Sequence, residues 1–144
     1  MYRILRADDS KTTIIIRLMV GAVFLSEGIQ KFLFPGDVGA GRFEKIGLPE
    51  PALLGGLVGS FEILCGTLIL LGFLTRLASL PLIVIMITAI SVTKLPIVAD
   101  EGIWKMFHDS RTDWSMLLGS IFLIIKGGGS WSVDRMFSRK IAIQ

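Results

Sequence analysis

Ionisable residues inside otherwise apolar stretches are the part of this sequence that could do chemistry. The stretch FLSEGIQKFLFPG, residues 24–36, carries Glu27 and Lys31, and Glu62 lies in the middle of a second apolar stretch. Burying a lone carboxylate in hydrocarbon costs several kcal/mol unless it is paired or protonated. A glutamate at such a depth is therefore a candidate for carrying protons or binding a polar ligand.

Four long apolar runs must position these residues. Hydrophobic residues make up 52% of the 144-residue chain and the mean hydropathy is +0.70, well above that of an ordinary soluble domain. A run of about 20 apolar residues is long enough to cross a bilayer as a helix. We therefore expect an all-α fold, a four-helix transmembrane bundle that forms one domain over residues 1–144. The expected spans are about 12–34, 52–74, 77–98 and 112–125.

The distribution of basic residues predicts the orientation of this bundle. The end that carries both termini holds nine Lys and Arg residues, Arg3 and Arg6 among them, and the other end holds six. Because cytoplasmic segments carry the excess of Lys and Arg, both termini should be cytoplasmic. The segments at about 35–51 and 99–111 should then be extracytoplasmic. We expect a multi-pass protein of a bacterial or archaeal inner or plasma membrane.

Helical periodicity predicts that the ionisable residues face one another. Glu62 shares a face of the second span with three glycines, and Lys31 shares a face of the first span with Arg17 and two glycines. Small residues at this spacing let helix backbones approach closely in membranes. All four spans therefore bring ionisable groups to the outer half of one bundle. We interpret Glu62 and Glu27 as candidate catalytic residues, and Lys31, Gln30, Lys94 and Asp113 as candidate substrate-binding residues.

A purely structural role is the alternative for each of these residues. Glu27 and Lys31 stand at i, i+4 with the acid first, which is the favourable order for a helical ion pair. Lys31, Lys94 and Asp113 lie near span ends, where charged side chains commonly reach the membrane interface, and anchoring is the favoured interpretation for them. Glu62 is too deep for that, so a functional role is favoured. Glu27 lies between the two cases.

The numbers of cysteine and histidine residues limit the kinds of reaction that this chain could carry out. Cys65 is the only cysteine and His108 the only histidine, which excludes an intramolecular disulfide, a CxxC redox pair and a Cys/His metal cluster. Ligand sets for haem and iron–sulfur clusters are missing as well. The basic residues flank apolar runs and form no patch, so we expect no nucleic-acid partner. We interpret the run KGGGSWSVDR, residues 126–135, as a flexible helix exit, because no strand precedes it as in a phosphate-binding loop.

The order and spacing of four motifs resemble the DoxX family of small membrane proteins. These motifs are FLSEGIQKFLFP, GLP, FEILCGTLILLGFLTRLA and GGGSWSVD, and the resemblance extends from about Arg17 to Asp134. It implies four transmembrane helices with both termini on one side, and an association with membrane oxidoreductases that reduce quinones. Many family members have a histidine at the position of Glu27, so imidazole chemistry is not carried over to this chain. Matching positions are Gly28, Lys31, Pro35, Glu62, Gly66, Thr75, Arg76, Gly127, Gly129, Ser132 and Asp134.

Three functions fit these observations. The first is a quinone-linked redox component or accessory subunit of a membrane oxidoreductase, in which Glu62 and Glu27 exchange protons with a quinone head group and Lys31 offsets negative charge. Quinone is then the one expected cofactor, and a membrane or soluble oxidoreductase is the partner that supplies electrons. The alternatives are a non-catalytic assembly subunit and a proton-coupled transporter of a small solute. A transporter this small would have to work as a homo-oligomer.

Overall fold

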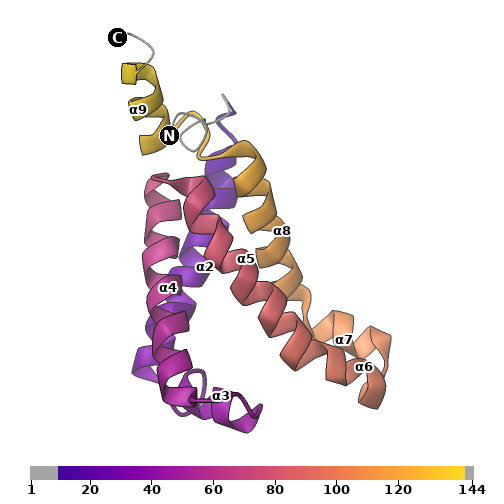
Figure 1. Ribbon diagram of the computed structural model, residues 1–144. Helices are drawn as coiled ribbons and strands as arrows, with labels where there is room; N and C mark the ends of the chain where they lie inside the picture. Colours follow the sequence, from indigo (N-terminus) through magenta and orange to yellow (C-terminus); the bar gives the residue numbers. More distant parts are fainter. Residues whose placement is uncertain (1–9, 142–144) are drawn as a thin grey trace.

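The computed structural model describes residues 10–141, and this part of the chain consists of helices joined by short connections, with no strand (Figure 1). The all-α prediction is confirmed. Arg3 and Arg6, which contributed to the predicted orientation, lie outside the described residues. The bundle is formed by α2 (Thr13–Leu33), α4 (Pro51–Leu71), α5 (Thr75–Ala89) and α8 (Arg111–Lys126). The other elements are α3 (Ala40–Lys45), the π-helical turn η1 (Ile90–Lys94), α6 (Leu95–Glu101), α7 (Ile103–Asp109) and α9 (Val133–Ile141).

Within residues 10–141, three helical segments are long and apolar enough to cross a membrane. They are α2, α4 and the continuous segment α5–η1–α6, residues Thr75–Glu101. The predicted second span extends three residues too far, because α4 ends at Leu71 and Gly72 turns the chain with a φ of 67°. The fourth predicted span corresponds to α8, which has 16 residues and falls short of that length. The structure thus identifies three spanning helices by length and composition.

The four bundle helices form two pairs. α2 packs along α4, and α5 packs along α8, and we name these the α2/α4 pair and the α5/α8 pair. We name the two ends of the bundle the hairpin end, which carries the α4–α5 turn and α9, and the α3 end, which carries α3, α6 and α7 (Figure 1). The pairs meet toward the hairpin end and diverge toward the α3 end (Figure 1). Fully buried apolar side chains join them where they meet, at Val20, Phe24, Ile69, Leu82 and Leu123.

Glycines bring α2 and α4 into backbone contact, as the sequence predicted. A Cβ atom added to Gly28 would lie 2.7 Å from the carbonyl oxygen of Gly59, and one added to Gly66 would lie 2.9 Å from the carbonyl oxygen of Gly21. Such distances are closer than side chains allow, so larger residues would push the helices apart. Close approach of this kind is a principal source of helix association in membranes, where apolar burial gives little driving force.

Arg17 holds the hairpin end together. Its side chain is buried, and the guanidinium donates to the carbonyl oxygens of Ile69 and Leu70 at the end of α4, at 2.9 and 2.5 Å. It also donates to the carbonyl oxygens of Gly128, at 3.1 Å, and Trp131, both in the loop after α8. The planar, five-donor guanidinium suits this task, because its donors point in fixed and separate directions.

Asp134 completes this end by capping α5. Its carboxylate accepts hydrogen bonds from the backbone N–H groups of Leu74 and Thr75, at 2.7 and 3.0 Å. The first N–H groups of a helix have no partner inside the helix, and a negative charge beside them is stabilising. Leu74 has a φ of 49°, in the left-handed region that costs a non-glycine residue roughly 1–2 kcal/mol. The Asp134 contact helps to hold the turn in that conformation.

The loop after α8 is part of the packed structure, so the prediction of a flexible helix exit at residues 126–135 is wrong. Gly128, Gly129 and Ser132 are buried, and the Ser132 hydroxyl donates to the carbonyl oxygen of Gly129 at 2.7 Å. A side chain at Gly128 would collide with Ser132, at 2.7 Å. The glycines are therefore needed for close packing around Arg17.

We predict that Arg17→Gln lowers the free energy of unfolding by about 3–5 kcal/mol, the usual cost of removing one member of a buried charged network. The change would leave carbonyl oxygens of α4 and of the loop after α8 without their donor. Titration of the protein in mixed micelles with a denaturing detergent measures this loss. Lys11→Gln, at an exposed position of the same end, is the control and should change little. Equal stability of the two variants would contradict this account of the hairpin end.

Candidate functional site

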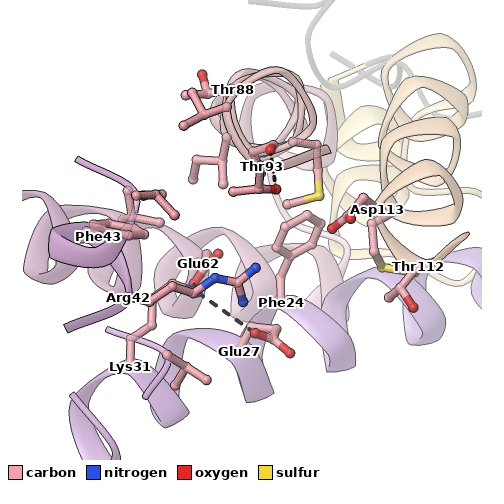
Figure 2. Close-up of a pocket in the computed structure, with 18 of the residues that line it drawn as sticks. Phe24, Glu27, Lys31, Arg42, Phe43, Glu62, Thr88, Thr93, Thr112 and Asp113 are labelled. Atoms are coloured by element: carbon pink, nitrogen blue, oxygen red, sulfur yellow. Dashed lines mark hydrogen bonds and ion pairs between the residues drawn. The ribbon is translucent and has the colours of Figure 1, made fainter. Parts of the chain in front are cut away.

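A cavity of about 550 Å³ separates the two helix pairs in the half of the bundle toward the α3 end. One wall comes from α2 and α4, and the opposite wall comes from α5, η1 and the first turns of α8 (Figure 2). Residues of the segment around α3, including Val38, Arg42 and Phe43, line its α3 end. The cavity follows from the fold, because the pairs diverge from the contact that the buried core and Arg17 hold at the other end.

Lys31 and Glu62 form an ion pair inside the bundle. The Lys31 Nζ atom lies 2.7 Å from Glu62 Oε2, and the two side chains are 10% and 3% exposed. The glycine contact between α2 and α4 makes this geometry possible, because Lys31 follows Gly28 by three residues and Glu62 follows Gly59 by three. Helical side chains lean toward the N-terminus, so the long Lys31 side chain reaches back along α2 to the carboxylate. Pairing offsets the large cost of burying either charge alone.

Glu27 extends this pair toward the surface. Its Oε2 atom lies 3.9 Å from Lys31 Nζ, and its side chain is 48% exposed. Lys31 therefore stands between a buried carboxylate and an exposed one (Figure 2). An ammonium group has three N–H donors, so Lys31 can contact both carboxylates or turn one donor toward a ligand in the cavity.

A second ion pair lies on the opposite wall. Lys94 Nζ is 3.4 Å from Asp113 Oδ2, which joins η1 to α8. The π-helical turn contains Thr93 and Lys94, and its end is marked by the bond from the Leu95 N–H to the carbonyl oxygen of Ile90. π-helical turns change the direction of the side chains within a helix and are frequent at functional sites. Pro96 follows directly and has no N–H to continue the ordinary α-helical bonding.

Asp109, the last residue of α7, adds a further carboxylate to the cavity lining. It pairs with Lys105 at 2.7 Å, and the hydrogen bond from that ammonium holds the pKa of the Asp109 carboxyl below its usual range. Asp109 is therefore ionised at neutral pH and is a poor proton donor. Its contribution to the cavity is a fixed negative charge.

The rest of the lining is mainly apolar. α4 contributes Leu54 and Val58, and α5 contributes Val84, Ile85 and Met86. Phe24 of α2 and Met116 of α8 also line the cavity. The lining thus combines a few convergent polar groups with extensive apolar surface, which is the usual composition of a binding site for a small ligand.

The structure brings five of the six predicted site residues into this one cavity: Glu27, Lys31, Glu62, Lys94 and Asp113. Gln30 is the exception, and its predicted place beside them is wrong. It lies about 100° around α2 from Lys31, and its amide donates to Ser26 Oγ at 2.9 Å, away from the cavity. Cys65 packs in the apolar core. The catalytic and substrate-binding roles of the five residues stay predictions.

Sequence reasoning missed Arg42, Thr93 and Asp109. Arg42 reaches the cavity because α3 folds back against α4, which no periodicity in the loop indicates. The sequence did contain a signal for the position of Thr93. Pro96 has no backbone N–H, so it marks a place where the regular hydrogen bonding of the helix is interrupted and side chains change direction. Within the part of the chain that the structure describes, no three His, Cys, Asp or Glu side chains gather as a metal-ligand set.

We predict strong coupling between Lys31 and Glu62 in a double-mutant cycle. Glu62→Gln and Lys31→Met should each lower the free energy of unfolding by about 3–5 kcal/mol, because each strands the other charge. The double variant Lys31→Met, Glu62→Gln should lose clearly less than the sum of the two. The exposed Lys105–Asp109 pair, at the same 2.7 Å, is the matched control and should show far weaker coupling. Additive losses for Lys31 and Glu62 would contradict a buried pair.

Comparison with known proteins agrees with the motif resemblance. The profile of the DoxX family matches residues 12–95, which include α2, α4, α5 and η1 but not the GGGSWSVD run. The chain is 51% identical, over 144 aligned residues, to the uncharacterized membrane protein Rv3486 of Mycobacterium tuberculosis, and the alignment covers 96% of this chain and 88% of the relative. No solved structure matches the chain. The chain is therefore a multi-pass membrane protein that belongs to the DoxX family.

Proposed function

We propose that the cavity binds the head group of a membrane quinone and that the protein is a quinone-linked component of a membrane oxidoreductase. One observation carries this proposal: two lysine–carboxylate pairs, Lys31–Glu62 and Lys94–Asp113, line opposite walls of one largely apolar cavity. A para-quinone is a flat apolar ring with a carbonyl oxygen at each end. Ammonium donors on opposite walls suit the two carbonyl oxygens, and the apolar lining suits the ring.

In the proposed chemistry, the protons and the electrons reach the quinone from different sources. Reduction of a quinone to a quinol takes up two electrons and two protons. The carboxyl groups of Glu62 and Glu27 would pass the protons, and Lys31 between them would stabilise negative charge on the quinone oxygen. The electrons would come from a partner oxidoreductase, because the chemistry of electron transfer belongs to a flavin or metal cofactor held by such a protein.

We further propose that α8 is a fourth span and that both termini are cytoplasmic. Like the three longer segments, α8 exposes large apolar side chains, including Leu118, Ile121 and Ile125, that require hydrocarbon around them. Its 16 residues, which include Lys126, extend about 24 Å, and the preceding α7 can supplement this length at the interface. The distribution of basic residues supports the orientation. The cavity then lies in the extracytoplasmic half of the membrane.

An assembly subunit without its own ligand is the second candidate. The two ion pairs each join different helices, α2 to α4 and η1 to α8, so they could serve mainly to fix helix register. A transporter is less well supported. The residues that line the cavity lie in the half of the bundle toward the α3 end, whereas buried apolar side chains and Arg17 fill the hairpin end.

Ligand binding tests the proposal. We expect wild-type protein in lipid nanodiscs to bind a tailless benzoquinone saturably, and we expect Lys31→Met, Lys94→Met and Glu62→Gln each to weaken this binding. Loss of one charged hydrogen bond of about 1.5–3 kcal/mol corresponds to roughly a 10- to 100-fold loss of affinity. Lys45→Met removes the same kind of charge at an exposed position outside the cavity lining and should leave binding unchanged. Isothermal titration or quenching of intrinsic tryptophan fluorescence gives the affinity.

Two outcomes would contradict the proposal. One is wild-type protein that binds no quinone, and the other is quinone binding that none of the three cavity variants changes. If these variants instead reduced the recovery of a co-purified partner and left no ligand effect, the assembly subunit would be the better description. Uptake of a solute into proteoliposomes in response to a pH gradient would favour the transporter.

A further inference from the structure

We infer that the ligand of this cavity is a long-chain amphiphile that enters sideways from the lipid, through a portal between α4 and α5. This portal is defined by Leu54 and Val58 on α4 and by Val84 and Thr88 on α5, all of which line the cavity. The inference rests on the proposed quinone site and adds the class of quinone and its route. It selects a quinone with a lipid-soluble tail over a water-soluble one.

The exposure of these residues indicates an opening. Val84 lines the cavity and is also 63% exposed on the surface of the bundle, and Thr88, one turn further along α5, is exposed as well. Across from them, Val58 lines the cavity and is half-buried. A residue that touches both the cavity and the surface lies at the mouth. The mouth between α4 and α5 is therefore mainly apolar, and Thr88 brings one hydroxyl group to its α5 side.

The depth of the mouth places it against hydrocarbon. Val84 follows the start of α5 by nine residues, about 14 Å along the helix, and Val58 precedes the end of α4 by 13 residues, about 20 Å. Both positions fall well inside the roughly 30 Å hydrocarbon layer if the hairpin end lies at one interface. An apolar opening at this depth exchanges its contents with lipid and not with water.

The other side of the cavity has a different character. Where α2 faces α8, the lining includes the polar residues Glu27, Thr112 and Asp113, and Glu27 is half exposed (Figure 2). Phe24 and Met116 line the same side. The carboxylates there suit exchange of protons and disfavour an apolar tail. The two sides of the cavity therefore suit the two parts of an amphiphile. The polar head would lie at the ion pairs, and the tail would point toward Val58 and Val84.

The volume of the cavity supports the same conclusion. About 550 Å³ is within the usual range of 300–1,000 Å³ for small-ligand pockets and holds a substituted ring with a short chain. A long isoprenoid tail exceeds this space and has to leave the bundle. The portal between α4 and α5 is an apolar way out that leads directly into the lipid.

Blocking the portal tests the inference. The probes are a benzoquinone with a ten-carbon tail and the same ring without a tail, each titrated in nanodiscs of fixed lipid composition. Val84→Trp should weaken binding of the tailed probe at least tenfold more than it weakens binding of the tailless probe. Ile87→Trp is the matched control, because Ile87 is exposed on the same helix but does not line the cavity. It should change neither affinity.

A labelling experiment keeps the test independent of the tryptophan variants. A photoreactive diazirine at the end of the tail should label peptides of α4 and α5 around Val58 and Val84, as read by mass spectrometry. Labelling confined to α2 and α8 would overturn the portal, and so would equal effects of Val84→Trp and Ile87→Trp. If one of these results were found while the tailless probe still bound in a Glu62-dependent manner, the portal would be wrong and the quinone site would stand. If the wild-type protein bound neither probe, the quinone site itself would fail.

Discussion

The ion pair between Lys31 and Glu62 is the interaction on which the arrangement of this site depends. A carboxylate and an ammonium group can remain inside a membrane helix bundle only if each compensates the other, because the surrounding dielectric is low. Their contact at 2.7 Å requires α2 and α4 to approach as closely as glycine backbones permit. Helix packing and site chemistry are therefore two consequences of the same sequence pattern, in which a charged residue follows a glycine by three positions on each helix.

The two ends of the bundle have different tasks. At the hairpin end, Arg17 and Asp134 form hydrogen bonds with backbone groups of α4, α5 and the loop after α8. Their charged groups are therefore occupied by structural contacts. Toward the α3 end, the charges of Lys31 and Lys94 face a cavity and keep donors that a ligand can use. A closed end and an open end in one small bundle favour the proposed ligand-binding role over transport.

Much of this arrangement was readable from the sequence. The length of the apolar runs predicts the long helices, and the spacing between Gly59 and Glu62 predicts the helix face on which the Glu62 carboxylate lies. Five of six site residues follow from face and depth together, and Gln30 fails because one residue's step around a helix changes its face. The role of the run at residues 126–135 was not readable, because the contact of Arg17 with it joins positions more than 110 residues apart. The fold-back of α3, which brings Arg42 to the cavity, also depends on tertiary packing.

The distance between Glu62 and Lys31 in a bilayer tests the central claim most directly. Solid-state NMR on protein with ¹³C-labelled glutamate and ¹⁵N-labelled lysine measures the dipolar coupling between the Glu62 carboxyl carbon and the Lys31 side-chain nitrogen. The account predicts the strong coupling of a direct contact, lost in Lys31→Met. A Glu62 carboxyl carbon that shows no coupling to lysine, and shows contact with lipid acyl chains instead, would contradict it.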